Sequence, residues 1–380
     1  MQIQTKTLDE KDLRIINALY KYGFGSSSRF LSKKINIPDR TISYRLKTLK
    51  DTGLLRIYPF MNERRLGLGD CCIVIQESET CKSSQISKLL EKIPFFYLIS
   101  STYGRYNGIL CFSVYSLDST HPKEFLEKLR TEELISDFEI YEICDHITSD
   151  PKLDYYDPHT GKWRWDWKQW EKEIETTLVQ EHSTDLFANL HLEQKQTVIN
   201  FDEIDIKLLK IKKDAFHNKK VILTNSELGK KLNLSAFKVR NRVQLLYDQG
   251  VIKGPLINFF CPEERDIHFI YLFVKMKDFQ QSSLVISSIC KLPFQVGIFV
   301  ESKTKFILYY RMRTEEFSEF LQSFDLLKDY LQSYFFQIVP FYYNNRHHLY
   351  NAYNENTKSW DTPIEEYYNL IENFKNTKKS

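Results

Sequence analysis

Residues 28–61 read SRFLSKKINIPDRTISYRLKTLKDTGLLRIYPFM, and this stretch decides the predicted fold. Pro38 separates two helical patterns, because proline is tolerated at a helix start but not inside a helix. In the second pattern Ile42, Leu46 and Leu49 follow at i, i+4 and i+7, which buries one helix face. A short apolar, β-prone run comes next. The pattern predicts a helix, a tight turn, a second helix and a β-wing.

The opposite face of the second helix carries cations, hydroxyl groups and an aromatic ring, a combination that suits a DNA major groove. Arginine either pairs with guanine or clamps a phosphate, so Arg45 is a candidate, with an ion pair to Asp51 as the alternative. Lys50 and Arg56 are expected to contact phosphates. The predicted DNA-contacting residues here are Arg40, Thr41, Ser43, Tyr44, Arg45, Lys47, Lys50 and Arg56.

The chain repeats itself once along its length. LSKKINI at residues 31–37 matches LGKKLNL at residues 228–234, and Arg45 matches Arg242. A second winged helix is therefore predicted, with an ion pair from Arg242 to Asp248 as the alternative to DNA contact. Its predicted DNA-contacting residues are Lys238, Arg240, Asn241, Arg242, Gln244 and Lys253.

Each winged helix is followed by the pattern β-α-β-β-α-β, which is that of a ferredoxin-like unit, and then by a Trp-Asp tail helix. The predicted fold is therefore α+β, with two winged helix-turn-helix domains and two ferredoxin-like domains in a tandem duplication. The aromatic stripes of the tail helices are assigned to the core. The expected domains are residues 1–66 and 198–260 (winged helices), 67–150 and 261–345 (ferredoxin-like), 151–197 (tail helix and linker) and 346–380 (tail helix).

Positive charge is concentrated in the two winged-helix segments. Residues 1–66 contain 14 Lys and Arg against 6 Asp and Glu, whereas the whole chain has a net charge of +3. Residues 201–256 contain 12 against 6, so the remainder of the chain is acidic. Such segregation is typical of a protein that binds a polyanion. The alternative is that these side chains only solvate helices.

Several motifs in the first half resemble the Lrp/AsnC family of prokaryotic transcription regulators. They are LDEKDLRIINAL from Leu8, the helix-turn-helix, and LGLG at residues 66–69. The stretch TYGRYNGIL from Thr102 is similar to the glycine-containing hairpin of that family's effector-sensing domain. The resemblance implies a DNA-binding regulator that senses a small effector such as an amino acid. The effector residues it implies are Gly104, Tyr106 and Asn107, and the alternative is a hairpin that needs glycine for its turn.

Other classes of protein find little support. No phosphate-binding glycine loop or HExxH motif occurs, and Asp145-His146 has no serine or cysteine motif beside it, so no enzymatic activity is predicted. His347 and His348 are expected to be exposed rather than metal ligands, so no metal or cofactor is predicted. Seven cysteines without a CxxC pair indicate a reduced, cytoplasmic compartment. No run of about eighteen apolar residues is present, so no membrane partner is expected.

The sequence therefore predicts a cytoplasmic, sequence-specific DNA-binding transcription regulator. Its expected partners are double-stranded DNA and a small effector. The two halves are expected to pair as an intrachain pseudo-dimer, with a homodimer left open. The alternative function is a winged-helix docking module that acts on the transcription machinery without reading DNA.

Overall fold

The computed structural model places most residues of the chain. Among these residues, no helix is long and apolar enough to cross a membrane. The described residues include parts of all four expected domains and of both expected tail helices. Glu181 to Thr197, the expected linker, lies largely outside them, as do His347, His348 and Cys261. The described residues are 8–23, 26–178, 186–187, 190, 192, 198–219, 223–259, 267–340 and 349–379.

The chain forms two compact units, each assembled from three separate segments. Unit 1 contains Met1–Tyr58, His146–Leu190 and Pro255–Tyr334. Unit 2 contains Pro59–Asp145, His191–Gly254 and Phe335–Ser380. The N-terminal winged helix therefore shares a unit with strands from the second half of the chain rather than with the strands that follow it directly.

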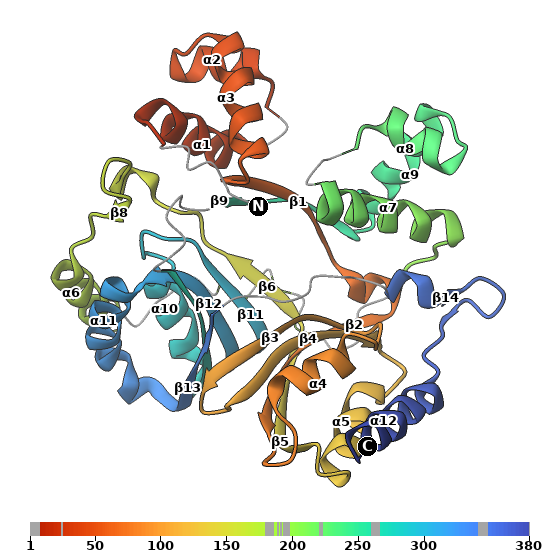
Figure 1. Cartoon of the computed structure of the whole chain (residues 1–380). Coiled ribbons are helices and arrows are strands. Elements are labelled where there is room, and N and C mark those ends of the chain that lie inside the picture. Colours follow the sequence, from red (N-terminus) through yellow and green to blue (C-terminus); the bar gives the residue numbers. More distant parts are fainter. Residues whose placement is uncertain are drawn as a thin grey trace. The chain divides into compact units, whose positions relative to one another are not determined.

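The N-terminal helices of unit 1 are α1 (Glu10–Tyr22), α2 (Ser28–Ile35) and α3 (Asp39–Asp51), followed by the wing strand β1 (Leu55–Met61) (Figure 1). The Asp9 carboxylate caps α1 by accepting a hydrogen bond of 2.9 Å from the Asp12 N–H, which satisfies a donor at the helix start. Ile42 and Leu49 are fully buried, as their spacing predicted. The helix-turn-helix and wing expected from residues 28–61 are present.

The sheet of unit 1 has the strand order β13-β10-β12-β11-β6. β10 pairs antiparallel with β12 from Ile267↔Arg313 to Lys275↔Lys305. The elements follow one another along the chain as the predicted β-α-β-β-α-β pattern. They are β10 (Ile267–Met276), α10 (Phe279–Ile289), β11 (Val296–Ser302), β12 (Lys305–Arg313), α11 (Thr314–Phe324), the 3-10 helix η4 (Asp325–Tyr330) and β13 (Leu331–Val339), with β6 (Asp145–Thr148) at the edge.

Within unit 2, the sheet strands have the order β5-β2-β4-β3. Its apolar face is buried against α4 and α5, with Phe95, Phe125 and Leu129 in the core. The elements again follow the predicted order. They are the 3-10 helix η1 (Glu63–Leu66), β2 (Leu68–Glu77), α4 (Ser83–Leu90), β3 (Phe96–Gly104), β4 (Gly108–Ser116), α5 (His121–Thr131) and β5 (Ile135–Ile143).

A second group of three helices belongs to unit 2 and consists of α7 (Glu203–Lys219), α8 (Asn225–Leu232) and α9 (Ala236–Asp248), followed by the strand β9 (Ile252–Phe259). Thr224 and Glu227 form a capping box at the start of α8. Val239 and Leu246 are buried on the inner face of α9. These helices lie where the sequence predicted the second winged helix.

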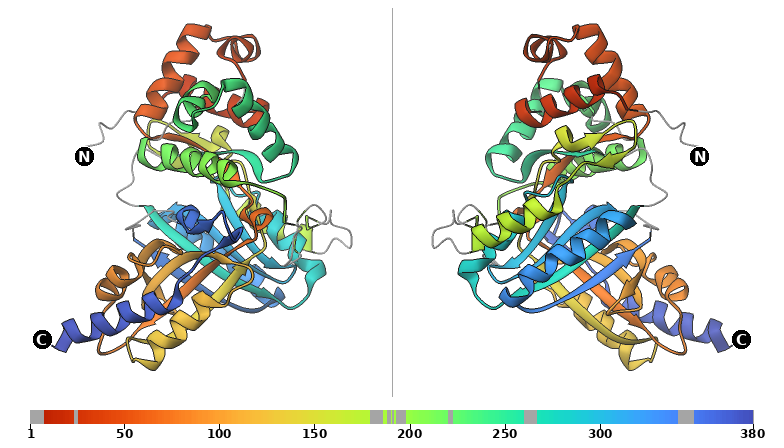
Figure 2. Two further views of the ribbon diagram at one scale, coloured as in Figure 1. Left: turned by 90° about the vertical axis from the view of Figure 1, so that its right-hand side faces the viewer. Right: turned by 90° about the vertical axis from the view of Figure 1, so that its left-hand side faces the viewer.

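Each tail consists of a short hairpin followed by a helix. Trp170 in α6 is buried, and its indole N–H donates to the Ser288 carbonyl at 2.9 Å. In the second tail, α12 lies beside α5 (Figure 2). Trp360 and Tyr367 are buried in the second tail, so the core role predicted for the tail aromatics is confirmed. The tail elements are η2 (Leu153–Tyr155), β7 (Tyr156–Asp157), β8 (Lys162–Trp163), α6 (Trp167–Leu178), η5 (Leu349–Ala352), β14 (Tyr353–Asn354), β15 (Ser359–Trp360) and α12 (Ile364–Lys379).

Candidate nucleic-acid interface

The outer face of α3 offers side chains of the kind that read DNA. Tyr44 is 72% exposed, and no apolar neighbour covers its ring as it would in a core. Of the predicted residues, Arg40, Ser43, Tyr44 and Lys47 are exposed, whereas Thr41, Lys50 and Arg56 are half-buried. Burial lowers the pKa of Lys50 from its ordinary value.

Arg45 points into its own domain. Its Nη1 donates to Asp9 Oδ1 at 2.7 Å and to Asp12 Oδ1 at 2.9 Å, and the Asp12 side chain is fully buried. Burial alone would raise the pKa of Asp9, but hydrogen bonds from Arg45 and from the Asp12 N–H hold it below its usual value. The ion-pair alternative therefore describes this arginine, although with Asp9 and Asp12 in place of Asp51. The clamp joins α3 to the start of α1.

Arg242 makes an equivalent clamp in unit 2. Its guanidinium donates to Asp202 and to Asp205, each at 2.8 Å. The pKa of Arg242 is raised, first by the hydrogen bond to Asp202. Asp248, the partner expected from the sequence, instead accepts a hydrogen bond from Gln244 at 2.8 Å. Both arginines thus hold a recognition-type helix in place rather than extending from it.

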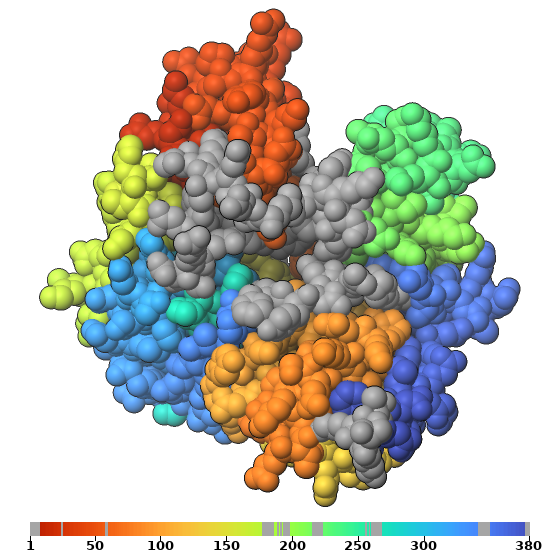
Figure 3. All heavy atoms as spheres, viewed as in Figure 1, coloured from red at the N-terminus to blue at the C-terminus, as the bar shows by residue number. Residues whose placement is uncertain are grey.

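The outer face of α9 is less polar than that of α3. Lys238, Arg240 and Asn241 are exposed as predicted. Phe237 and Leu245 are also exposed, at 70% and 49%, and the sequence analysis did not select them. Both lie away from the face of α9 that Val239 and Leu246 bury, and this helical spacing was the signal that could have found them. The α7–α9 group is coloured green in Figure 3.

Lys253 is engaged within unit 2. Its ammonium group lies 2.7 Å from Asp145 Oδ1, and the Asp145 side chain is 4% exposed. A phosphate contact by Lys253 would therefore compete with an ion pair to a buried carboxylate. The neighbour of Asp145 in sequence, His146, packs against the Phe299 ring in unit 1, with 5.0 Å between ring centroids. These adjacent residues do not form a common site.

The hairpin expected to bind an effector is in contact with other residues of the chain around Gln337. Gln337 is fully buried, and its Nε2 donates to the Tyr106 carbonyl at 2.9 Å. A Cβ at Gly104 would lie 2.1 Å from the Phe336 carbonyl oxygen, so glycine is needed there for a close approach of two strands. The Tyr106 hydroxyl donates to Glu139 at 3.1 Å, and burial together with this carboxylate raises the pKa of Tyr106 to about 12.

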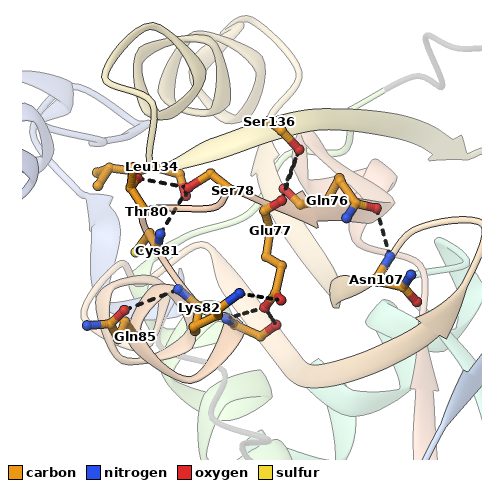
Figure 4. Close-up of polar contacts among 11 residues, drawn as sticks. Gln76, Glu77, Ser78, Thr80, Cys81, Lys82, Gln85, Asn107, Leu134 and Ser136 are labelled. Carbon is orange, nitrogen blue, oxygen red and sulfur yellow. Dashed lines mark hydrogen bonds and ion pairs between the residues drawn. The ribbon is translucent and has the colours of Figure 1, made fainter.

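Asn107 anchors the same hairpin to the end of β2. Its backbone N–H donates to Gln76 Oε1 at 2.8 Å (Figure 4). Its carbonyl accepts a hydrogen bond from the Glu77 N–H at 3.0 Å. Glu77 in turn accepts hydrogen bonds from the N–H and hydroxyl of Ser83 at the start of α4. All three predicted effector residues therefore have structural roles, and effector binding by them stays a prediction.

The described residues contain no group of three or more His, Cys, Asp or Glu that could hold a metal ion. The six cysteines among them are free thiols, five of which are buried.

Comparison with known proteins identifies the N-terminal segment. Residues 8–56 match a family model described as winged helix-turn-helix DNA-binding. A stretch of 107 residues is 27% identical to an uncharacterised HTH-type transcriptional regulator of Pyrococcus abyssi, covering 27% of this chain and 71% of that regulator. The predicted winged helix-turn-helix is thereby confirmed for the first segment.

A solved enzyme has the fold of nearly the whole chain. The siroheme decarboxylase NirDL matches over 95% of this chain and 99% of its own, at 11% identity and a TM-score of 0.50. LrpC of Bacillus subtilis covers only 37% of this chain, with a TM-score of 0.30. At such identities the likeness to NirDL concerns the fold alone, but it overturns the prediction that the chain is not an enzyme. Missing sequence motifs could not exclude catalysis, because folding can assemble a site from residues that are far apart in the sequence.

Proposed function

We propose that the chain is a transcription regulator that binds double-stranded DNA through α3 and α9. The observation that carries this proposal is the division of labour on α3. Arg45 fixes the helix to α1 through two carboxylates, while Arg40, Tyr44 and Lys47 remain exposed on the outer face. A rigid helix with exposed donors and cations is what readout in a major groove requires.

Exposed and half-buried residues of this surface each have an expected role in the proposal. Arg40, Ser43 and Tyr44 contact base edges, whereas Lys47, Lys50 and Arg56 contact phosphates, which contribute affinity without sequence information. On α9, Arg240, Asn241 and Gln244 read bases, and the exposed Phe237 ring fits the methyl group of thymine. Arg45 and Arg242 act as positioning residues.

The proposal also covers the relation between the two halves of the chain and the role of an effector. The two halves arose as a tandem duplication and form an intrachain pseudo-dimer that addresses two unlike half-sites. A small effector modulates binding. The unequal outer faces of α3 and α9 support the two-half-site arrangement, because identical helices would read identical sequences.

The test is fluorescence anisotropy of labelled duplexes from the DNA upstream of the protein's own gene, across a salt series. The double variant Arg40→Ala/Lys47→Ala removes two exposed cations from α3. Loss of the phosphate contact assigned to Lys47 should lower the slope of log affinity against log salt by about 0.9. Loss of the base contact assigned to Arg40 should weaken binding to the preferred fragment more than binding to other duplexes. The control, Lys168→Ala/Lys172→Ala, removes two exposed cations from α6 in the same unit. Equal weakening by both double variants would contradict specific use of α3. Absence of binding at low salt would favour protein docking instead.

A second candidate is catalysis on a tetrapyrrole, which the NirDL fold over 95% of the chain favours. Purified protein would be incubated with siroheme under anaerobic conditions, and loss of carboxyl groups would be followed by mass spectrometry. Turnover that survives the Arg40→Ala/Lys47→Ala change would establish an activity independent of DNA binding. An unchanged tetrapyrrole spectrum would leave the regulator as the function.

A further inference from the structure

Unit 2 contains an open pocket with a volume of 560 Å³ that none of the predicted sites includes. It lies between the loop from β4 to α5, the hairpin β14–β15, and the segments around Leu66–Gly67 and Val198–Phe201. Its volume is within the range of small-molecule sites, roughly 300–1,000 Å³. The hairpin with Gly104 and Tyr106 does not contribute to this pocket.

An aromatic wall forms the apolar side of the pocket. The rings of Phe201 and Tyr353 lie 5.3 Å apart, and those of Tyr353 and Trp360 lie 5.2 Å apart. The Trp360 indole N–H donates to the Leu66 carbonyl at 2.8 Å, which fixes the ring position. A preformed aromatic surface of this kind favours the flat or apolar part of a ligand, because little side-chain entropy is lost on binding.

The polar side of the pocket offers hydroxyl groups and a cation. The Ser119 hydroxyl is buried and has no hydrogen-bond partner among the described residues. His121 Nδ1 and Thr362 Oγ1, which both line the pocket, are joined by a hydrogen bond of 2.5 Å. Lys358 is the cationic side chain of the lining, and the one carboxylate among the described lining residues, that of Asp118, is exposed.

Lys358 adopts a backbone conformation that lysine normally avoids. Its φ is +51°, and the residue at the same place in the other tail hairpin is Gly161, with φ +68°. A non-glycine residue in the left-handed region costs about 1 kcal/mol. The chain therefore places a cation in the pocket at a position where glycine would be less strained.

We propose that this pocket binds a small organic acid, with its apolar part against Trp360 and its carboxylate near Lys358 and Ser119. The backbone N–H of Ile199 donates to the Arg65 carbonyl at 2.9 Å, so the two connecting segments are joined at the pocket. Leu66 follows the first wing along the chain, and Phe201 lies two residues before the start of α7. A bound acid therefore stabilises the connection from which the second helical group begins. This coupling rests on the proposed DNA-binding function, whereas the binding itself does not.

The test uses isothermal titration calorimetry on the full chain with phenylacetate, indole-3-acetate and hexanoate. The corresponding amines, phenethylamine, tryptamine and hexylamine, serve as charge-reversed probes. We expect saturable binding of one acid per chain and no binding of the amines. Lys358→Gly keeps the backbone conformation and removes the charge, so it should weaken acid binding by about tenfold. Ser119→Phe fills the pocket and should abolish binding.

Lys123→Ala is the matched control, because Lys123 is exposed on α5 but does not line the pocket. Equal loss of acid affinity in Lys123→Ala and Lys358→Gly would overturn the proposal, as would binding of no acid by correctly folded protein. Acid binding without any effect on DNA affinity would retain the pocket and remove the coupling. If the chain binds acid but no DNA, the proposed function fails and the pocket stands.

Discussion

Replacement of Arg45 by alanine should destabilise the N-terminal winged helix rather than remove a base contact. Asp12 would keep a fully buried side chain without its cation, since Arg45 donates to it at 2.9 Å. Breaking a buried ion pair from one side costs roughly 3–5 kcal/mol, whereas an exposed pair contributes about 0–1 kcal/mol. Asp9 is half exposed and Arg45 is one-fifth exposed, which moderates the loss. We expect about 2–3 kcal/mol.

Hydrogen-exchange mass spectrometry measures this loss locally. A destabilisation of about 2–3 kcal/mol corresponds to roughly 30- to 150-fold faster exchange in α1 and α3, if exchange follows opening of this domain. Arg242→Ala should have a smaller effect in α7 and α9, because the Asp205 side chain retains 9% exposure and Arg242 is itself more exposed than Arg45.

A compensating variant separates the two explanations for Arg45. Arg45→Ala/Asp12→Asn also removes the buried negative charge that faces Arg45, so it should recover part of the protection lost in Arg45→Ala. The opposite result would be wild-type exchange rates in α1 and α3 of Arg45→Ala together with a large loss of DNA affinity. That result would refute the structural role of Arg45 and support a direct contact with DNA.

Two further changes test unit 2. Gly104→Ala should lower the thermal unfolding temperature, because the new Cβ would lie 2.1 Å from the Phe336 carbonyl oxygen and φ is +148°; unchanged unfolding would show that the two strands separate easily there. Burial and the nearby Glu63 raise the pKa of Asp70 to about 7, although Tyr97 donates to it. The folded state therefore holds the Asp70 proton more tightly than the unfolded state does. The free energy of unfolding should fall by about 1.4 kcal/mol per pH unit as pH rises from about 4 to about 7. The stability of Asp70→Asn relative to wild type should therefore be greater at pH 8 than at pH 5 in urea titrations. An equal difference at the two pH values would contradict the raised pKa of Asp70.

Local sequence patterns determined which elements form. The spacing of Ile42 and Leu49 predicted the buried face of α3, and both side chains are fully buried. Asp9, directly before α1, accepts the capping hydrogen bond from the Asp12 N–H. Such features were predictable because helix periodicity and capping depend on residues only a few positions apart.

Contacts between distant segments decided what the predicted functional residues do. Arg45 pairs with carboxylates 33 and 36 positions away, and Tyr106 contacts Gln337 across 231 positions. No periodicity in the sequence announces such pairs. Residue type alone had made Arg45 and the hairpin candidates for contact with DNA and with an effector. Their contacts within the chain show that both groups are already engaged.

The sequence alone therefore determined the order of helices and strands, the N-terminal winged helix and the concentration of positive charge. The tertiary structure decided which segments share a unit, which cations remain exposed and where a pocket opens. The physical reason is that burial patterns are local properties of a helix or strand. Charge pairing and cavity shape depend instead on which surfaces meet after the chain has folded.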